Sequence, residues 1–205
     1  MKQNQARPPL RERNRQRVHQ RILNAAFELF RTTGYDQTTM DTIAALAEVS
    51  RGTLFNYFPT KSMLLIPFLK ELYFQRVRPE VLPYLETQPT TLQALRFLFI
   101  SIYEHIFKFP DMDHAIQALQ QEMFHPHPDD ADINEGTGFL DNVQAILEYG
   151  QRRGEVRTDI ALEKLTRYVG VLYVSLIGNM IDMGATNKYT NEVDILLAFI
   201  GSAFR

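Results

Sequence analysis

Apolar residues near the start of the chain recur at intervals of three and four, which is the spacing of one face of an α-helix. This pattern predicts an amphipathic helix over residues 13–33, which Gly34 would end. Thr38 and Thr39 are N-cap candidates for a second, short helix. The residues of that helix that we expect to point inward are Ile43, Leu46 and Ala47.

Ser50 has the side chain and the position of an N-cap for a third short helix, which continues to Tyr57. Pro59 ends this helix, and Thr60 is the N-cap candidate of a fourth helix that starts at Lys61. Three helices within about 45 residues, with a tight turn between the second and the third, are typical of a helix-turn-helix unit.

The fourth helix is apolar on much of its surface and contains Pro67, which should kink it because proline lacks a backbone donor. We expect Pro79, Pro83 and Pro89 to interrupt the chain before residue 90. The remainder shows no strand-like alternation and predicts five more helices, the fourth of them capped by Asp159. Their expected ranges are 91–109, 111–124, 137–153, 160–184 and 190–204. The predicted fold class is therefore all-α.

The net charge of −2 conceals an uneven distribution of charge along the chain. Residues 1–61 hold ten Lys and Arg against five Asp and Glu, whereas residues 62–205 hold twelve against nineteen. The first 21 residues alone hold seven basic residues, with Glu12 as their single acid. A basic end on an acidic body indicates an anionic polymer as partner, and a solvated tail is the alternative.

Composition and motifs also argue against disulfide-bonded, membrane-spanning, secreted and enzymatic classes of protein. The absence of cysteine excludes disulfides, thiolate catalysis and cysteine-based zinc sites. No apolar run approaches the roughly 18 residues of a membrane span, and the basic start lacks the apolar core of a secretory signal, so we expect a cytoplasmic protein. Without a phosphate loop or a nucleophile–base set, we expect neither enzyme activity nor a cofactor. Residues 125–130 match no standard zinc spacing and predict an exposed loop rather than a metal site.

The segment ILNAAFELFRTTGYDQTTMDTIAALAEVSRGTLFNYFPTKSMLL resembles the DNA-binding region of the TetR family of transcriptional regulators. The resemblance covers about residues 15–66. It implies a helix-turn-helix domain joined by a connecting helix to a larger helical domain that binds an effector and dimerises. We therefore expect these parts: a basic arm at 1–12, a DNA-binding domain at 13–60, and an effector-binding and dimerisation domain at 61–205 whose connecting helix is 61–78.

Within this resemblance, the third helix is the recognition helix, which presents its first residues to base edges in the major groove. Arg51 suits bidentate bonding to guanine, Gly52 permits close approach, and Thr53 can contact a thymine methyl or a base. Thr39 can offer its hydroxyl and backbone N–H to a phosphate. Lys61 is similar to the family's phosphate-contacting lysine.

Several residues around the recognition helix have more than one reading. Ser50 is first a helix cap and second a DNA contact. Family members commonly carry Tyr where this chain has Phe55, so Phe55 lacks the hydroxyl that would reach a phosphate, and Asn56 or Tyr57 is left to supply a donor. Leu54 and Phe58 are expected in the core, because their spacing puts them on one face. The arginines that precede or open the first helix suit either a minor groove or non-specific attraction: Arg7, Arg11, Arg13, Arg15 and Arg17.

The larger domain is expected to supply a homodimer interface on its last two helices, because one recognition helix reads too few bases and two related copies read a palindromic double-stranded operator. The expected interface residues are Leu165, Val169, Leu172, Leu176, Val193, Leu196, Leu197 and Ile200. The effector pocket is expected among the helices before them and should suit a lipophilic or aromatic compound. Its candidate lining residues, each of which also suits plain core, are Phe99, Tyr103, Phe107, Met123, Phe124, Phe139, Val143, Tyr168 and Met180.

The sequence thus predicts a dimeric, sequence-specific DNA-binding regulator, typically a repressor in this family, that a small effector releases from its operator. The alternatives are an activator, an effector-independent DNA binder, and an all-helical small-molecule-binding protein or enzyme. The residues leave open the effector, the operator, the regulated genes and whether Pro67 is a hinge or a fixed bend.

Overall fold

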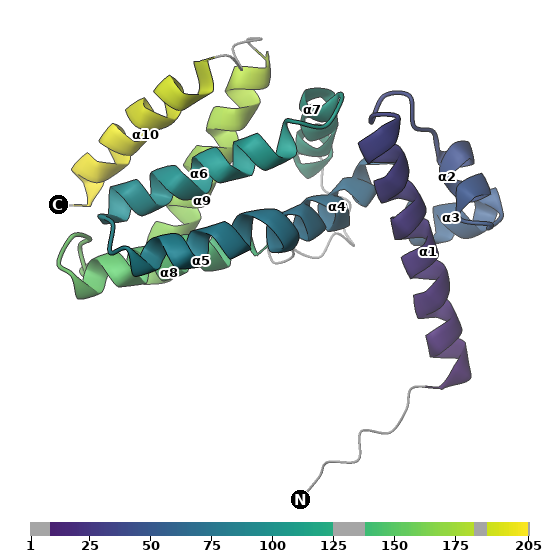
Figure 1. Ribbon diagram of the computed structural model, residues 1–205, viewed down its shortest axis with the longest axis horizontal. Helices are drawn as coiled ribbons and strands as arrows, with labels where there is room; N and C mark the ends of the chain where they lie inside the picture. Colours follow the sequence, from purple (N-terminus) through teal and green to yellow (C-terminus); the bar gives the residue numbers. More distant parts are fainter. Residues whose placement is uncertain (1–8, 125–137, 183–187, 205) are drawn as a thin grey trace, which may run out of the picture.

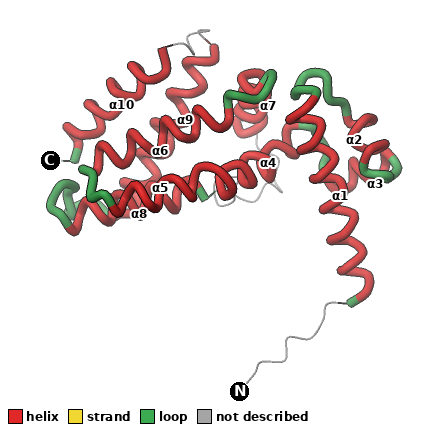
Figure 2. Tube along the Cα trace, viewed as in Figure 1, coloured by secondary structure: helices red, strands yellow, loops and turns green. Residues whose placement is uncertain are grey.

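The computed structural model describes residues 9–124, 138–182 and 188–204, and these residues form helices joined by turns, without a strand (Figures 1 and 2). The predicted all-α fold class is confirmed. Three N-terminal helices lie at one end of the molecule, and a larger helical body forms the other end (Figure 1). None of the described helices is long and apolar enough to cross a membrane.

The N-terminal unit consists of α1 (Leu10–Thr32), α2 (Met40–Leu46) and α3 (Arg51–Tyr57). The first fully buried side chain of α1 is Ile22. Roughly three turns of α1 therefore precede the packed part of the helix. Figure 1 shows this segment projecting beyond α2 and α3.

Leu46 corrects the predicted core of α2. Its side chain is 45% exposed, so the expectation that it points inward is wrong. Ile43, Ala44 and Ala47 are buried and together form the packed face of this seven-residue helix. Because successive residues are 100° apart, Leu46 falls on the flank of that face.

The connection between the two units is an almost unbroken helical rod, visible as the long run of α4 and α5 in Figure 1. It comprises a 3₁₀ turn η1 (Ser62–Leu64), α4 (Leu65–Leu72), a π-helical turn η2 (Tyr73–Val77) and α5 (Arg78–Glu86). Pro67 lies in the first turn of α4, where a backbone N–H commonly has no intrahelical partner. The proline is thus tolerated there at little cost.

Pro79 and Pro83 lie inside α5, so the expectation that they interrupt the chain is wrong. Directly before Pro79, the N–H of Arg78 bonds to the carbonyl of Tyr73, five residues back. In an α-helix a proline ring clashes with the carbonyl four residues before it. The wider π turn offers a physical reason why the rod can continue through Pro79.

The larger body contains all five of the predicted C-terminal helices, with ends that shift by up to three residues. They are α6 (Thr91–Ile106), α7 (Met112–Phe124), α8 (Phe139–Arg152), α9 (Leu162–Asp182) and α10 (Tyr189–Ala203). Asp159 does not cap α9 as predicted. The Arg157 guanidinium donates to both of its carboxylate oxygens, and the Ala161 carbonyl accepts the first bonds of α9 instead.

The core of the larger body centres on α6, whose Leu95, Leu98 and Phe99 have no exposed surface. Two phenols meet above it: Tyr173 and Tyr189 both donate to the Phe99 carbonyl, at 3.1 and 2.8 Å, and their hydroxyls lie 2.9 Å apart. Burial raises the pKa of both tyrosines. These hydroxyls therefore tie α9 and α10 to the backbone of α6.

The start of α7 joins the two units. Met112 and Ala115 are buried in the same core cluster as the helices of the N-terminal unit. Asp111 has a φ of 57° and lies against Gly34, where an added Cβ would meet its Oδ2 at 2.5 Å. Gly34 itself has a φ of 90°, so both its conformation and its surroundings exclude a side chain. The core of the N-terminal unit therefore continues past residue 60, where we expected its edge.

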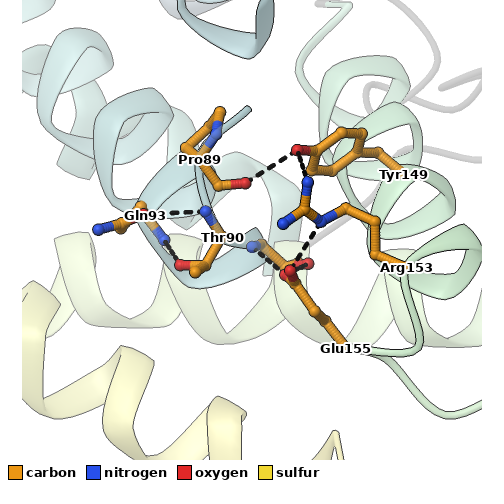
Figure 3. Close-up of polar contacts among 7 residues, drawn as sticks. Pro89, Thr90, Gln93, Tyr149, Arg153 and Glu155 are labelled. Atoms are coloured by element: carbon orange, nitrogen blue, oxygen red, sulfur yellow. Dashed lines mark hydrogen bonds and ion pairs between the residues drawn. The ribbon is translucent and has the colours of Figure 1, made fainter. Parts of the chain in front are cut away.

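Polar contacts fasten the far end of the larger body, as Figure 3 shows. The Glu155 carboxylate accepts from the N–H and the hydroxyl of Thr91, at 2.6 and 2.7 Å, and from Arg153 Nε at 2.8 Å. Arg153 also donates to the Tyr149 hydroxyl, which donates to the Pro89 carbonyl. These bonds hold the α8–α9 turn to the N-terminus of α6.

Replacing Glu155 with Gln should destabilise the protein. Burial would raise the pKa of Glu155, but the bonds from Thr91 and Arg153 outweigh it and lower that pKa. Because the folded pKa lies below the unfolded one, the stabilisation is full above the unfolded pKa and disappears as the pH falls through the folded pKa. We expect a loss of about 1–2 kcal/mol at pH 7 and convergence with the wild type in acid, measured by urea unfolding. A constant difference at every pH would contradict this explanation.

Candidate nucleic-acid interface

The predicted caps of α2 and α3 are confirmed. Thr39 Oγ1 accepts from the Thr42 N–H at 3.1 Å, and Thr42 Oγ1 accepts from the Thr39 N–H at 3.0 Å, which completes a capping box. Ser50 Oγ accepts from the Thr53 N–H at 3.1 Å and lies 2.8 Å from the Thr53 hydroxyl. The polar groups of Thr39 and Ser50 are therefore engaged within the protein before any partner is present.

The exposed side of α3 carries Arg51, Gly52 and Asn56. A Cβ added to Gly52 would meet no atom within 4 Å, so another molecule can approach the backbone here. The Arg51 guanidinium lies 5.4 Å from the centre of the Phe55 ring and 3.3 Å from an Asp41 oxygen. Phe55, 36% exposed, thus supports Arg51 from below.

The other side of α3 holds the helix to its unit. Leu54 and Phe58 are buried, as predicted. Tyr57 is half-buried against the same core, and its hydroxyl donates to the Arg15 carbonyl at 3.2 Å. Its ring and that of Phe58 lie 6.0 and 5.2 Å from the ring of His19. Of the two donors considered beside Phe55, Asn56 is thus the exposed one, and Tyr57 braces α1.

Lys61 lies beneath the turn between α1 and α2. Its ammonium donates to the carbonyls of Tyr35 and Thr38, at 2.7 and 2.9 Å, and lies 4.0 Å from the centre of the Tyr35 ring. Burial lowers its pKa, and the carboxylates of Asp36 and Asp111 oppose that shift. Lys61 therefore stabilises the turn that leads to Thr39, and any phosphate contact would use its remaining proton.

Arg21 is a structural residue that the sequence analysis counted only as part of the basic end. Its guanidinium donates to the carbonyl of Ala47 at 3.0 and 2.6 Å and to that of Glu48 at 2.6 Å. These carbonyls end α2, and Glu48 has a φ of 52°. A cation at a helix C-terminus is favourable, but the contact spans 26 residues and has no local sequence signal.

The first turns of α1 form a basic ridge beside α3. Four predicted arm residues are exposed on it: Arg11, Arg13, Arg15 and Arg17. Arg7 lies outside the described residues. A hollow of about 780 Å³ between this ridge and Tyr57 is lined by Pro9, Arg11, Glu12, Asn14, Arg15, Val18 and Tyr57. Arg11 and Arg15 thus lie beside α3, whereas Arg13 and Arg17, two residues further along in each case, are turned to another side of α1.

The predicted effector-lining residues fall into three groups. Phe99 and Val143 have no exposed surface, Met180 is buried, and the partly buried Tyr103, Phe107 and Phe139 pack near them. Tyr168 is 57% exposed, so its assignment to a pocket is wrong: it lies on the outer side of α9. The side chains of Met123 and Phe124, and the loop of residues 125–130, lie outside the described part.

Aromatic rings fill this core closely. Phe99 stacks on Tyr173 with 4.1 Å between ring centres, and Tyr103 stacks on Tyr189 at 3.8 Å and on Phe107 at 4.7 Å. Among the described residues, no group of three or more histidine and acidic side chains is arranged to hold a metal.

Comparisons with known proteins identify the fold and the family. Residues 22–66 match the family described as bacterial regulatory proteins, tetR family. The likeness extends to the larger body. This chain is similar in structure to Thermus thermophilus FadR, a TetR family transcriptional repressor whose crystal structure is in complex with lauroyl-CoA. The TM-score is 0.74 and the identity is 29%, and the match covers 88% of this chain and 92% of that one. These likenesses support the assignment of the chain to the TetR family.

Two curated regulators show how far the sequence likeness extends. The transcriptional regulator YuxN of Bacillus subtilis is 29% identical over 90 residues, which are 44% of this chain and only 31% of that protein. The transcriptional repressor NicS of Pseudomonas putida is 26% identical over 160 residues, which are 75% of this chain and 72% of that protein. The homologues and the fold indicate a transcriptional regulator rather than an enzyme.

The expected dimer residues on α9 and α10 lie mostly on the inner side of these helices. Most lie inside the chain's own core: Leu165, Val169, Val193, Leu197 and Ile200 are buried, and Leu172, Leu176 and Leu196 are partly buried against it. The apolar residues on the outer side of α9 and α10 are instead Tyr168, Val171, Val174, Ile195 and Phe199. The buried residues thus serve the chain's own core, and the surface that would bind a second copy stays a prediction.

Replacing Arg21 with Met should destabilise the helix-turn-helix unit, because the carbonyls of Ala47 and Glu48 lose their charged donor. We expect a loss of about 1–2 kcal/mol in the free energy of unfolding, measured by urea denaturation. Arg17→Met is the matched control, since Arg17 is exposed on the same helix. Equal stability of the two variants would show that the Arg21 contacts contribute nothing to folding.

Proposed function

We propose that the protein is a dimeric repressor that reads a palindromic operator with α3 and is released from it by an acyl-CoA. The observation that carries this proposal is the outer end of α3, where Arg51 rests on Phe55 beside the open backbone of Gly52. A guanidinium presented in this way matches the O6 and N7 of guanine. The family membership supports the same reading.

The Arg51 contacts favour base reading over a structural role. Its ion pair with Asp41 is long and exposed, with both side chains about two-thirds accessible, so exchange for a base costs little. The Phe55 ring restricts the guanidinium without occupying its donors. Phe55 thus acts in DNA binding by positioning Arg51, while Thr53 and Asn56 offer further contacts and the α1 ridge attracts phosphates.

The outer apolar residues of α9 and α10 support self-association. Ile195 and Phe199 are one helical turn apart on α10, and Tyr168 and Val171 occupy one side of α9. Such a patch is disfavoured in water and suits a second copy related by a two-fold axis. A dimer would place two copies of α3 on successive half-sites of a palindrome, as expected for a cytoplasmic regulator of this family.

The proposed effector class rests on the solved relative. The Thermus protein was crystallised with lauroyl-CoA and aligns over most of both chains. The larger body of this chain has an apolar, aromatic core, with which an acyl chain is chemically compatible. Repression rather than activation is supported by the fact that both that protein and NicS are repressors.

The start of α7 and the α4–α5 rod supply a route for release. Ligand-induced displacement of α6 would move Asp111 and Met112, which touch Gly34 and the core beneath α2 and α3. The His114 ring and the Asp36 carboxylate, 2.6 Å apart, add a further contact between the units, and Asp36 raises the pKa of His114. An effector that binds one arrangement better than the other thus changes operator affinity.

Replacing Arg51 with Ala should abolish specific operator binding. Loss of the bidentate contact is expected to weaken binding by about 10- to 100-fold per half-site, without change in fold. Fluorescence anisotropy on DNA from the protein's own upstream region, at fixed salt, measures the effect. Arg152→Ala is the control, because Arg152 is an exposed cation far from α3. Specific binding that survives in Arg51→Ala would refute α3 as the reading helix.

Footprinting on the same DNA tests the regulatory part of the proposal. We expect a symmetric protected site that disappears when lauroyl-CoA is added and persists with free CoA. Protection that lauroyl-CoA does not alter would favour an effector-independent regulator or another effector class, and stronger protection would reverse the sign of the response.

Replacing Phe199 with Asp should yield monomers, because each dimer interface would bury a carboxylate in apolar surroundings. Analytical ultracentrifugation measures the change in mass. Ser202→Asp, an exposed position near the end of the same helix, is the control for added charge. A dimer that persists in Phe199→Asp would place the interface elsewhere.

A further inference from the structure

Among the side chains that the structure describes, two buried polar atoms have no hydrogen-bond partner: the hydroxyl of Tyr73 and Nδ2 of Asn142. The residues are 4% and 8% exposed. The same core satisfies its other deeply buried phenols, because Tyr173 and Tyr189 both donate to the Phe99 carbonyl. Unsatisfied buried donors are costly and rare in native proteins.

The two atoms belong to neighbouring side chains from different helices, η2 and α8. A side-chain contact from Asn142 lowers the pKa of Tyr73, but the geometry of that contact falls short of a hydrogen bond, so neither atom has a well-formed partner. Burial raises the pKa of Tyr73, so its hydroxyl keeps its proton and can donate throughout the physiological range. The pair therefore presents an O–H and an amide N–H, both without an acceptor.

The local backbone shows two departures from regular structure at this point. Tyr73 begins the π-helical turn, a feature that is frequent at functional sites. Gly138, with a φ of 73°, brings the backbone before α8 against the aromatic rings of the rod: an added Cβ would lie 2.8 Å from Phe74 Cζ and 3.1 Å from Tyr73 Cε1. Tyr73 and Asn142 are thus set at a close junction of the rod and α8.

The charges around the pair favour an uncharged acceptor. Arg78 and Asp141 act on Tyr73 in opposite directions: the first lowers its pKa and the second raises it. The guanidinium of Arg78 lies 5.4 Å from the centre of the Phe74 ring. With both signs of charge nearby, a carboxylate gains little there, whereas a carbonyl oxygen can accept from both donors.

We propose that Tyr73 and Asn142 are the polar anchor of the effector site and donate hydrogen bonds to the thioester carbonyl oxygen of an acyl-CoA. This inference rests on the effector class proposed above. The apolar core beside the pair would take the acyl chain, and the anchor would fix the position of its carbonyl. Because Tyr73 lies on the rod that continues from α4, the bound carbonyl contacts the element that leads to the helix-turn-helix unit.

Two ligands that differ at this oxygen test the proposal. Lauroyl-CoA carries the carbonyl, and S-dodecyl-CoA, a thioether, has a methylene in its place. Isothermal titration of the full-length protein should show at least tenfold tighter binding of lauroyl-CoA by the wild type. In Tyr73→Phe and Asn142→Leu this preference should shrink severalfold, and the ligand-free variants should melt at or above the wild-type temperature because each loses an unsatisfied donor.

Tyr189→Phe is the matched control within the same core. Its hydroxyl already has partners, so we expect a lower melting temperature of the ligand-free protein and an unchanged preference for the thioester. Loss of the Tyr73 hydroxyl should leave the melting temperature unchanged or raised and reduce the preference for the thioester. Loss of the Tyr189 hydroxyl should lower the melting temperature and leave that preference unchanged.

The possible outcomes separate this inference from the proposed function. Equal binding of both ligands by the wild type would overturn the anchor while leaving acyl-CoA as the effector. Binding of neither ligand would overturn the effector class and the anchor together. A ligand-free Tyr73→Phe protein that is less stable than the wild type would show that the hydroxyl already has a partner in solution, and would also overturn the anchor.

Discussion

The position of α3, the proposed recognition helix, depends on the burial of the first turn of α7 in the core of the helix-turn-helix unit. Met112 and Ala115 pack there together with Leu64, Leu65 and Phe68 of the connecting rod. The edge-on contact between Phe68 and Phe109, at 5.7 Å, extends the same packing toward the α6–α7 turn. Because these side chains are almost without exposed surface, the N-terminal unit has no complete core of its own.

Two links therefore join the larger body to the helix-turn-helix unit and would couple the proposed effector site to operator binding, one through the chain and one through contact. The rod carries Tyr73 at its centre and the buried side chains of α4 at one end. The contact link places Asp111 against Gly34, directly before the turn that Lys61 holds. A displacement of the larger body must act on both links, and packed cores respond by changing between discrete arrangements rather than by bending.

Features of the fold that depend on local physical signals could be predicted from the sequence. The caps of Thr39 and Ser50 and the buried spacing of Leu54 and Phe58 depend on residues within one or two turns, and all were predicted. Arg21, Lys61 and Tyr57 bond to carbonyls between 23 and 42 residues away in sequence, so no local pattern shows their roles.

On α9 and α10, periodicity shows an apolar stripe but cannot say whether it faces the chain's own core, and Tyr168 was misplaced for the same reason. The unsatisfied pair of Tyr73 and Asn142 had no signal, because it exists only through the packing of distant helices.

The shared core also limits how regulators of this architecture can be recombined. An exchange of DNA specificity that cuts the chain after residue 60 would transfer α1, α2 and α3 but leave behind Met112 and Ala115. The transplanted helices would then meet the α7 of another protein, with a cavity or a clash in place of the native fit. A functional chimaera of this protein has to carry the α6–α7 turn and the start of α7 along with the helix-turn-helix. The set of residues that supports the helix-turn-helix is therefore discontinuous in sequence.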